Sequence, residues 1–152
     1  MEEKKYQIIL YGATGFTGKL CAEYFHSNYP DLNWAIAGRN KEKLENLKYD
    51  LNLDCDIFVA DSEDYEAIQN FVKQTKVVLS AAGPFARYST KVVEACVECK
   101  THYTDITGEN HWVKGLIDRF HEKAALDGTR IIPSCGYDSI PSDMGVFFSV
   151  TR

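Results

Sequence analysis

Long hydrophobic runs are missing from this chain of 152 residues. No stretch approaches the roughly 18 apolar residues that a helix needs to cross a membrane. The first five residues, Met1–Lys5, are mostly charged and lead into the next segment without the hydrophobic stretch of a signal peptide. We therefore expect a protein without a transmembrane segment, located in the cytoplasm.

Massed positive charge is missing too. The net charge is −5 at pH 7 and the lysines are scattered, which argues against a nucleic-acid partner. The hydrophobic content of 45% is ordinary for a globular protein, and the length suits a single domain with a substantial core. We expect one domain over residues 1–152.

The cysteines offer no disulfide framework. Their number, five, is odd, and their spacing matches no framework pattern. Cys96 and Cys99, followed by His102, resemble half of a zinc site, but no second pair of ligands accompanies them. We therefore predict no metal and interpret both side chains as buried or half-buried thiols of a helix.

A glycine-rich segment directly follows an apolar run at residues 7–11. A strand, a glycine turn and a helix start suit the pyrophosphate of a dinucleotide, because the backbone turns tightly and helix N–H groups face the anion. The alternative is a glycine turn that binds nothing. The predicted pyrophosphate-binding residues are Gly12, Ala13, Thr14, Gly15, Phe16, Thr17 and Gly18.

The helix that follows this turn is predicted to be amphipathic. Phe16, Leu20, Tyr24 and Phe25 fall on one face at helical spacing, and Pro30 ends the helix.

A second apolar run begins at Trp34 and ends where a dinucleotide fold selects its cofactor. Domains that prefer NAD place Asp or Glu at this strand end, whereas this chain has Gly38 followed by Arg39. A small residue leaves room for a 2′-phosphate, and a guanidinium can bind that phosphate or stack on adenine. Asn40 adds a donor, so the pattern predicts NADP(H) rather than NAD(H). The alternative is a solvated Arg39 at a helix start.

Strands and helices alternate along the rest of the chain. We predict strands at 56–60, 77–80, 102–105 and 130–133, with helices near 88–98, 109–127 and 139–148 and one opened by Asp61-Ser62. This alternation predicts an α/β fold: a Rossmann-type, doubly wound parallel sheet of six strands in the order 3-2-1-4-5-6, with helices on both faces.

The carboxyl ends of these strands meet at one edge of the predicted sheet. Asp61 and Ser62 follow the third strand, where adenine is expected. The small residues that follow the fourth strand are expected beside the nicotinamide ribose, although an ordinary loop would look the same. They are Ala81, Ala82, Gly83 and Pro84.

Several motifs together resemble the saccharopine dehydrogenase-like oxidoreductases, in the branch that includes the trans-acting enoyl reductases. They are Tyr11–Gly18, Ala37–Arg39, Ala82–Phe85, Tyr103–Asp105 with Gly108–Glu109, and Cys135–Asp143. The resemblance covers nearly the whole chain. It implies an NADP-binding Rossmann domain at the N-terminus of a longer reductase, in which a second α/β domain shapes the substrate site before the chain returns to the first.

The final residues, 147–152, are predicted to lie in the middle of a helix. We therefore expect a piece of a longer reductase that binds the cofactor and turns over little or no substrate, because most of the substrate pocket would be missing.

Several polar residues follow the fifth and sixth strands, where a substrate should approach. Carboxylates or phenols there could orient a substrate or move a proton, but Asp105 and Ser139 also suit helix N-caps and Glu109 suits a first helical turn. We assign no catalytic residue. The candidates are Asp105, Glu109, Cys135, Tyr137, Asp138 and Ser139.

Three functions stay open. The chain is expected to belong to an oxidoreductase that transfers a hydride between nicotinamide and a small-molecule substrate, an imine, carbonyl or enoyl compound. Alternatively, it is a non-catalytic module that senses NADP, or a structural protein that keeps a Rossmann shell. No Tyr has Lys four positions later, which argues against the short-chain dehydrogenase mechanism. The sequence leaves a homodimer open.

Overall fold

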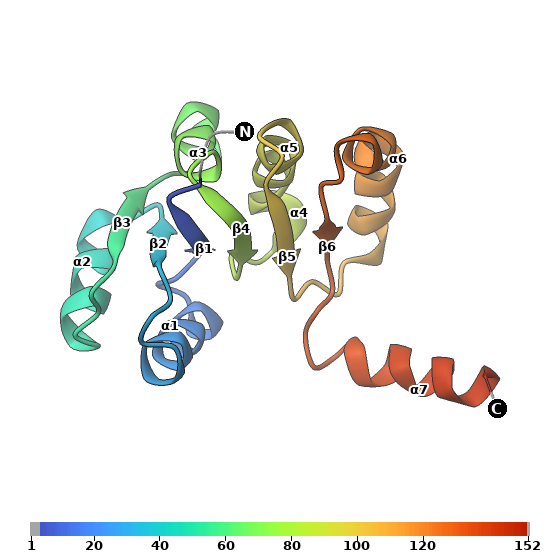
Figure 1. Ribbon diagram of the computed structural model, residues 1–152, viewed down its shortest axis with the longest axis horizontal. Coiled ribbons are helices and arrows are strands. Elements are labelled where there is room, and N and C mark those ends of the chain that lie inside the picture. The colour runs from blue at the N-terminus through green and yellow to red at the C-terminus, as the bar shows by residue number, and fades with distance from the viewer. Residues whose placement is uncertain (1–3, 152) are drawn as a thin grey trace.

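Six parallel strands form a sheet in the computed structural model, which describes residues 4–151. Their order is β3-β2-β1-β4-β5-β6, and every neighbouring pair is parallel, so the predicted fold and strand order are confirmed (Figure 1). The strands are β1 (Tyr6–Tyr11), β2 (Trp34–Gly38), β3 (Asp56–Val59), β4 (Thr75–Ser80), β5 (His102–Asp105) and β6 (Ile131–Ile132).

Helices connect the strands and cover both faces of the sheet (Figure 1). Parallel strands require such crossovers. The helices are α1 (Phe16–Asn28), α2 (Lys41–Asp50), α3 (Tyr65–Val72), α4 (Phe85–Tyr88), α5 (Thr90–Glu98), α6 (Asn110–Asp127) and α7 (Ile140–Val150).

The core is divided by the sheet into two layers. Leu10 packs with α1 and α2 on one face, while Ile9 and Tyr11 pack with α3 and α5 on the other. Successive side chains of a strand point to opposite faces, so β1 contributes to both layers. All five residues of β2 are buried. Burial on both faces fixes the carboxyl ends of the central strands, where the candidate site lies.

The predicted apolar face of α1 is wrong for most of its residues. Phe16 is 85% exposed, and Leu20 and Tyr24 are about half exposed. The helix instead packs through Gly18 and Ala22, both buried. Its first turn lies so close to the glycine segment that only small side chains fit, and hydrophobic periodicity does not detect such a close approach.

Some element boundaries also differ from prediction. Asp64, and not Asp61-Ser62, caps α3, since its carboxylate accepts from the backbone N–H of Ala67. The helix predicted near 88–98 is observed as α5, and a short helix that was not predicted, α4, precedes it. The sixth strand shrinks to two residues, and the last helix ends at Val150, with Arg152 outside the described residues.

The last helix, α7, stands apart from the sheet (Figure 1). It is rich in apolar residues, and none of its described side chains is buried. Within residues 4–151, no helix combines the length and the apolar character that crossing a membrane requires.

Candidate functional site: a nucleotide pocket at the switch point

The glycine segment between β1 and α1 is held together by close backbone contacts. Gly12 has a φ of +82°, and a Cβ there would lie 2.7 Å from the backbone nitrogen of Ala82. A Cβ on Gly18 would lie 2.2 Å from the carbonyl oxygen of Gly12. Both positions therefore require glycine for the fold itself. A Cβ on Gly15 would only reach ordinary contact, 3.4 Å from that same oxygen.

Gly15 is the N-cap of α1, and no side chain caps this helix. The first N–H groups of a helix have no partner within it and favour an anion. The segment thus presents backbone donors at the point where β1 ends, and Gly15 keeps the approach to them open.

A pocket of about 170 Å³ lies at this point, between the ends of β2, β1 and β4. From β1 the chain adds β2 and β3 on one side of the sheet and β4, β5 and β6 on the other. Doubly wound folds bind their ligands at this switch point. The predicted site residues that line it come from four separate segments. They are Gly12, Thr14, Gly15, Gly38, Arg39, Ser62, Ala81, Ala82 and Gly83.

Other predicted residues surround the pocket without lining it. Ala13 is fully buried beneath the turn, and Thr17 is half-buried in α1. The side chain of Asn40 caps α2 by accepting from the backbone N–H of Lys43.

Asp61 does not line the pocket either. Its carboxylate accepts a hydrogen bond from the backbone N–H of Glu63 and so shapes the turn after β3. Phe16, Gly18 and Pro84 also lie outside the lining, with Pro84 as the N-cap residue of α4.

Two tyrosines that the sequence analysis did not single out line the same pocket. Tyr88 is the last residue of α4, and its ring centroid lies 5.9 Å from Cζ of Arg39. Tyr11 ends β1, is 3% exposed, and stacks on Phe71 with ring centroids 5.6 Å apart. Its place directly before Gly12 is a signal that could have revealed it, whereas nothing local points to Tyr88.

Tyr11 lines the pocket, and within residues 4–151 its hydroxyl forms no hydrogen bond to another protein group and is reached by solvent. Burial raises the pKa of Tyr11 to about 12, the charge of Asp61 adds to this, and that of Arg39 opposes it. The group therefore remains a protonated donor over the usual pH range.

The wall formed by residues 81–86 is fastened from several directions. The backbone N–H of Ala81 donates to the carbonyl oxygen of Tyr11 over 2.8 Å. The carboxylate of Glu109 accepts from the backbone N–H groups of Phe85, at 2.6 Å, and of Ala86, at 3.1 Å. Glu109 thus caps α4 rather than serving α6 as a first-turn acid, so that prediction is corrected.

Asp105 is also not the helix cap that its position suggested. The carboxylate is buried and accepts from the hydroxyl of Tyr103 and from the backbone N–H groups of Thr107 and Ser134. Burial, together with the charge of Asp105, raises the pKa of Tyr103 well above its ordinary value. This network joins the loops after β5 and β6.

The remaining candidates for chemistry do not gather at the pocket. Tyr137 is 89% exposed, Asp138 and Cys135 are exposed, and Ser139 is the N-cap residue of α7 without a capping hydrogen bond from its side chain. None of them lines the 170 Å³ pocket.

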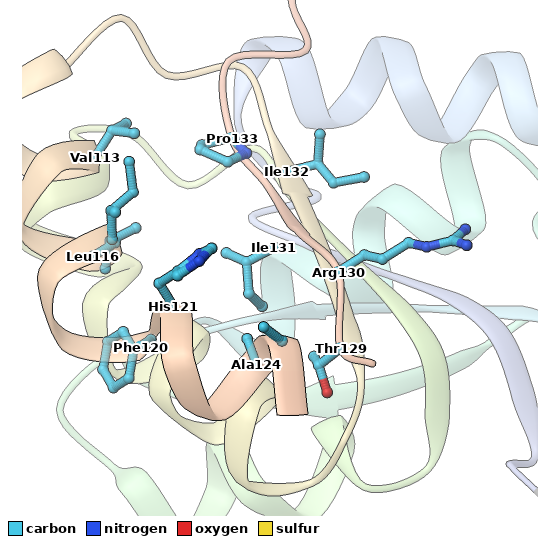
Figure 2. Close-up of a pocket in the computed structure, with 12 residues that line it drawn as sticks. Val113, Leu116, Phe120, His121, Ala124, Thr129, Arg130, Ile131, Ile132 and Pro133 are labelled. Carbon is cyan, nitrogen blue, oxygen red and sulfur yellow. The ribbon is translucent and has the colours of Figure 1, made fainter. Parts of the chain in front are cut away.

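A larger hollow, of about 320 Å³, lies between α6 and β6 at the edge of the sheet. Figure 2 shows Leu116, Phe120 and Ala124 of α6 on one side, Ile131 opposite them, and Arg130 directed away from them. The lining is mostly apolar and lacks backbone donors from a glycine turn. Its size does not make it the nucleotide site, because the chemistry of the smaller pocket fits an anion.

The paired cysteines behave as predicted. Cys96 is fully buried and Cys99 is half-buried, and burial raises the pKa of both thiols. Across residues 4–151, no three His, Cys, Asp or Glu side chains are grouped so that they could hold a metal ion.

A glycine turn between a central strand and a helix, at the switch point of a sheet in this order, defines a dinucleotide-binding Rossmann domain. The model of the saccharopine dehydrogenase NADP-binding domain matches residues 8–132, which is most of the chain. The chain therefore belongs to the saccharopine dehydrogenase NADP-binding family, and its dinucleotide is NADP.

Sequence relatives carry a more specific name. The chain is 39% identical over 149 residues to the trans-acting enoyl reductase of Mycobacterium leprae and 39% identical over 148 residues to that of Mycobacterium tuberculosis (strain H37Rv). These matches cover 96% and 95% of this chain but only 36% and 35% of the relatives. The chain thus spans about a third of the length of these relatives.

Solved structures share the fold. Saccharopine dehydrogenase (L-Glu forming) from Saccharomyces cerevisiae superposes with a TM-score of 0.73 at 19% identity, over 88% of this chain and 28% of that one. The triphenylmethane reductase of Citrobacter sp., solved with NADP(H), gives a TM-score of 0.62 at 20% identity, over 77% of this chain and 46% of that one. At these identities the likeness concerns the fold.

Proposed function

We propose that this chain is the NADP(H)-binding part of an oxidoreductase that moves a hydride between nicotinamide and an imine, carbonyl or enoyl substrate. The observation that carries the proposal is the pocket at the switch point, where the glycine segment meets Arg39 at the end of β2. The names of the relatives support the reductase class. Because the chain spans about a third of those relatives, the substrate and the complete enzyme belong to the proposal.

In this proposal the pyrophosphate lies on the N-terminus of α1, where Gly15 permits close approach. Gly38 is buried and lines the pocket beside Arg39, whose guanidinium can bind a 2′-phosphate. When bound, the nicotinamide would supply or accept the hydride. In the same proposal, Ala82 and Gly83, which line the pocket, would lie beside the ribose of the nicotinamide, and Ser62, with Asp61 just before it, would lie beside adenine.

The hydroxyl of Tyr11 adds a donor that this reading can use. Tyr11 lines the pocket, its hydroxyl has no partner in the described residues, and the charges of Asp61 and Arg39 both act on it. We propose that it donates a hydrogen bond to the adenosine half of NADP(H), because Tyr11 lines the same pocket as Arg39 and Ser62 and its hydroxyl is free to donate to a nucleotide oxygen.

A second candidate function is a non-catalytic module that reads the NADP state. The observation in its favour is that none of the acid–base candidates from Asp105 to Ser139 lines the pocket. Both candidates require NADP binding and differ in turnover. A homodimer and a cytoplasmic location are further parts of the proposal that await their own measurements.

The experiment that tests the proposal is calorimetric titration of the 152-residue chain with NADPH and with NADH at matched salt. We expect tighter binding of NADPH, and we expect Arg39→Ala to remove most of the preference while NADH affinity changes little. Equal affinities in the wild-type chain would remove the assignment of Arg39 to the 2′-phosphate. Absence of binding for both nucleotides would overturn the proposal, provided that circular dichroism shows a folded chain.

A further inference from the structure

The side chain of Arg39 reaches across the pocket to Tyr88. Arg39 follows β2 and Tyr88 follows β4, and β1 lies between these two strands in the sheet. The two residues nevertheless line one pocket, with Cζ of Arg39 5.9 Å from the centroid of the Tyr88 ring. A guanidinium within about 6 Å of an aromatic centroid is attracted to the ring.

The ring is the neighbour that orients this guanidinium. Within residues 4–151, Arg39 forms no ion pair with a carboxylate, and the residue is exposed. A long exposed arginine has many rotamers, and each one lost on binding a phosphate lowers the affinity. A ring that already holds the guanidinium near the pocket reduces that loss.

Tyr88 itself belongs to a firmly anchored element. Its backbone N–H donates to the carbonyl oxygen of Pro84 over 3.1 Å, and α4 is capped by the carboxylate of Glu109. The side chain of Tyr88 is half-buried. The backbone that carries the ring is therefore anchored, whereas Arg39 is exposed just after the end of β2.

A neighbouring arginine offers an internal control. Cζ of Arg87 lies 5.2 Å from the centroid of the same ring, but Arg87 does not line the pocket. The two guanidinium groups share the ring and carry the same charge. They differ in their access to a nucleotide.

We propose that Tyr88 is a specificity-determining residue that holds the guanidinium of Arg39 in position for the 2′-phosphate of NADP(H). The proposal rests on the function proposed above, in which Arg39 binds that phosphate. Tyr88 acts through Arg39, so it is a positioning residue whose loss should affect NADPH and spare NADH.

The test is a double-mutant cycle read out as the dissociation constants of NADPH and NADH. A cation–π contact at an exposed site corresponds to about a two- to fivefold change in an equilibrium constant. We expect Tyr88→Leu to lower the preference for NADPH over NADH by about that factor, and Tyr88→Phe to preserve the preference because the ring remains. In the Arg39→Ala background, Tyr88→Leu should leave the ratio of the two constants unchanged. Arg87→Ala should keep the preference of the wild-type chain.

The outcomes separate this inference from the proposed function. If Arg39→Ala removes the preference and Tyr88→Leu leaves it intact, the inference is wrong and the proposed function stands. If Arg39→Ala leaves the preference intact, both fail. Equal loss of NADPH and NADH affinity in Tyr88→Leu would make Tyr88 a direct nucleotide contact. A gain in affinity for both nucleotides would mean that the contact between Arg39 and Tyr88 hinders nucleotide entry. Either of these results overturns the positioning role.

A measurement on the wild-type chain covers the case in which Tyr88→Leu does not fold. The side-chain Nε–H proton of Arg39, identified by its loss in Arg39→Ala, is expected upfield of that of Arg130 in the proton NMR spectrum. The face of the Tyr88 ring shields a group held above it, whereas Arg130 lies over no aromatic ring of the described residues. Coincident positions of the two signals would overturn the inference.

Discussion

The carboxylate of Glu109 accepts a hydrogen bond of 2.6 Å from the backbone N–H of Phe85, which lies 24 residues earlier in the chain. This contact joins the start of α6 to the wall of the nucleotide pocket. Hydrogen bonds to a carboxylate are stronger than those between neutral groups. The second bond, from the backbone N–H of Ala86, makes Glu109 the cap of α4.

We expect Glu109→Ala to lower the free energy of unfolding by about 2–4 kcal/mol, and Glu109→Gln by about half of that, because two N–H groups lose a charged acceptor. Affinity for NADPH should fall as well, since Gly83 lies in the wall that the carboxylate anchors. Urea denaturation and calorimetry measure the two effects. Glu122→Gln, on an exposed position of α6, is the matched control. Equal stabilities of Glu109→Gln and this control would contradict the anchoring role.

The glycines of the turn should separate folding from binding. A Cβ on Gly18 meets backbone atoms at 2.2 Å, so Gly18→Ala is expected to destabilise the fold by about 3 kcal/mol or more. Gly15→Ala, at the N-cap of α1, should lose no more than about 1 kcal/mol of stability, because alanine caps a helix less well than glycine. It should nevertheless bind NADPH at least about tenfold more weakly, because its methyl group occupies the approach to the pyrophosphate.

Gly115→Ala provides the control for this pair, because it adds a methyl group in the middle of α6 where no atom lies within 4 Å. Its stability should be kept or raised by up to about 1 kcal/mol, as expected for alanine in a helix. Thermal melting and calorimetry report both properties. If Gly15→Ala binds NADPH like the wild-type chain, the pyrophosphate does not lie where we propose.

Removal of the Tyr11 hydroxyl tests the adenosine end of the pocket. Tyr11→Phe keeps the stacking on Phe71 and removes a hydrogen-bond donor from a residue that lines the pocket, so we expect NADPH affinity to fall by about two- to tenfold with little change in stability. The size of the effect should not vary between pH 6 and 9, since the pKa of Tyr11 is raised to about 12. Unchanged affinity in Tyr11→Phe would show that the hydroxyl does not contact the nucleotide.

Alkaline pH should destabilise the fold through its buried thiols. Burial raises the pKa of Cys55 from an ordinary value of 9.0 to about 11. Well below pH 9 the thiol is protonated in both the folded and the unfolded chain, so its full contribution to the free energy of unfolding is present. As the pH rises from 9 toward 11 the unfolded chain loses its proton first, so stability falls by up to about 1.4 kcal/mol per pH unit for this group.

Denaturation of the wild-type chain and of Cys55→Ala across this pH range measures the effect. In Cys55→Ala the free energy of unfolding should fall less steeply with pH than in the wild-type chain. The packing lost in the variant lowers this free energy by the same amount at every pH and does not affect the slope. Cys135→Ala, at an exposed thiol, is the control and should follow the wild-type slope. Parallel slopes in the wild-type chain and Cys55→Ala would contradict the expectation.

Local patterns in the sequence were sufficient for the architecture. Every residue of β2 is buried, and such short apolar runs, alternating with helical segments, lead directly to a parallel sheet covered on both faces. The position of the glycine turn after β1 then places the pocket, because doubly wound sheets bind ligands at one edge. Local periodicity failed at α1, where Phe16 and Tyr24 are exposed and small residues make the contact.

Long-range partners lay outside the reach of the sequence. Glu109 has the position of an ordinary first-turn acid, and only the fold brings its carboxylate to Phe85. Tyr88 and Arg39 belong to elements on opposite sides of β1, so their approach follows from tertiary structure. The sequence shows which residues carry charged or aromatic side chains. The residues that these side chains contact depend on packing between segments that are distant in the chain.

Divergence among related sequences is constrained differently at the three glycines of the turn. Gly12 and Gly18 are held by backbone atoms, of Ala82 and of Gly12 itself, and no exchange of neighbouring side chains can relieve such contacts. Gly15 has room for a methyl group, so a bound ligand opposes its replacement more than the fold does. A descendant that had lost its nucleotide would retain the outer two glycines and drift at the middle one. Glycine at position 15 would thus indicate a site that still binds its cofactor, whereas Gly12 and Gly18 would indicate only that the turn keeps its backbone conformation.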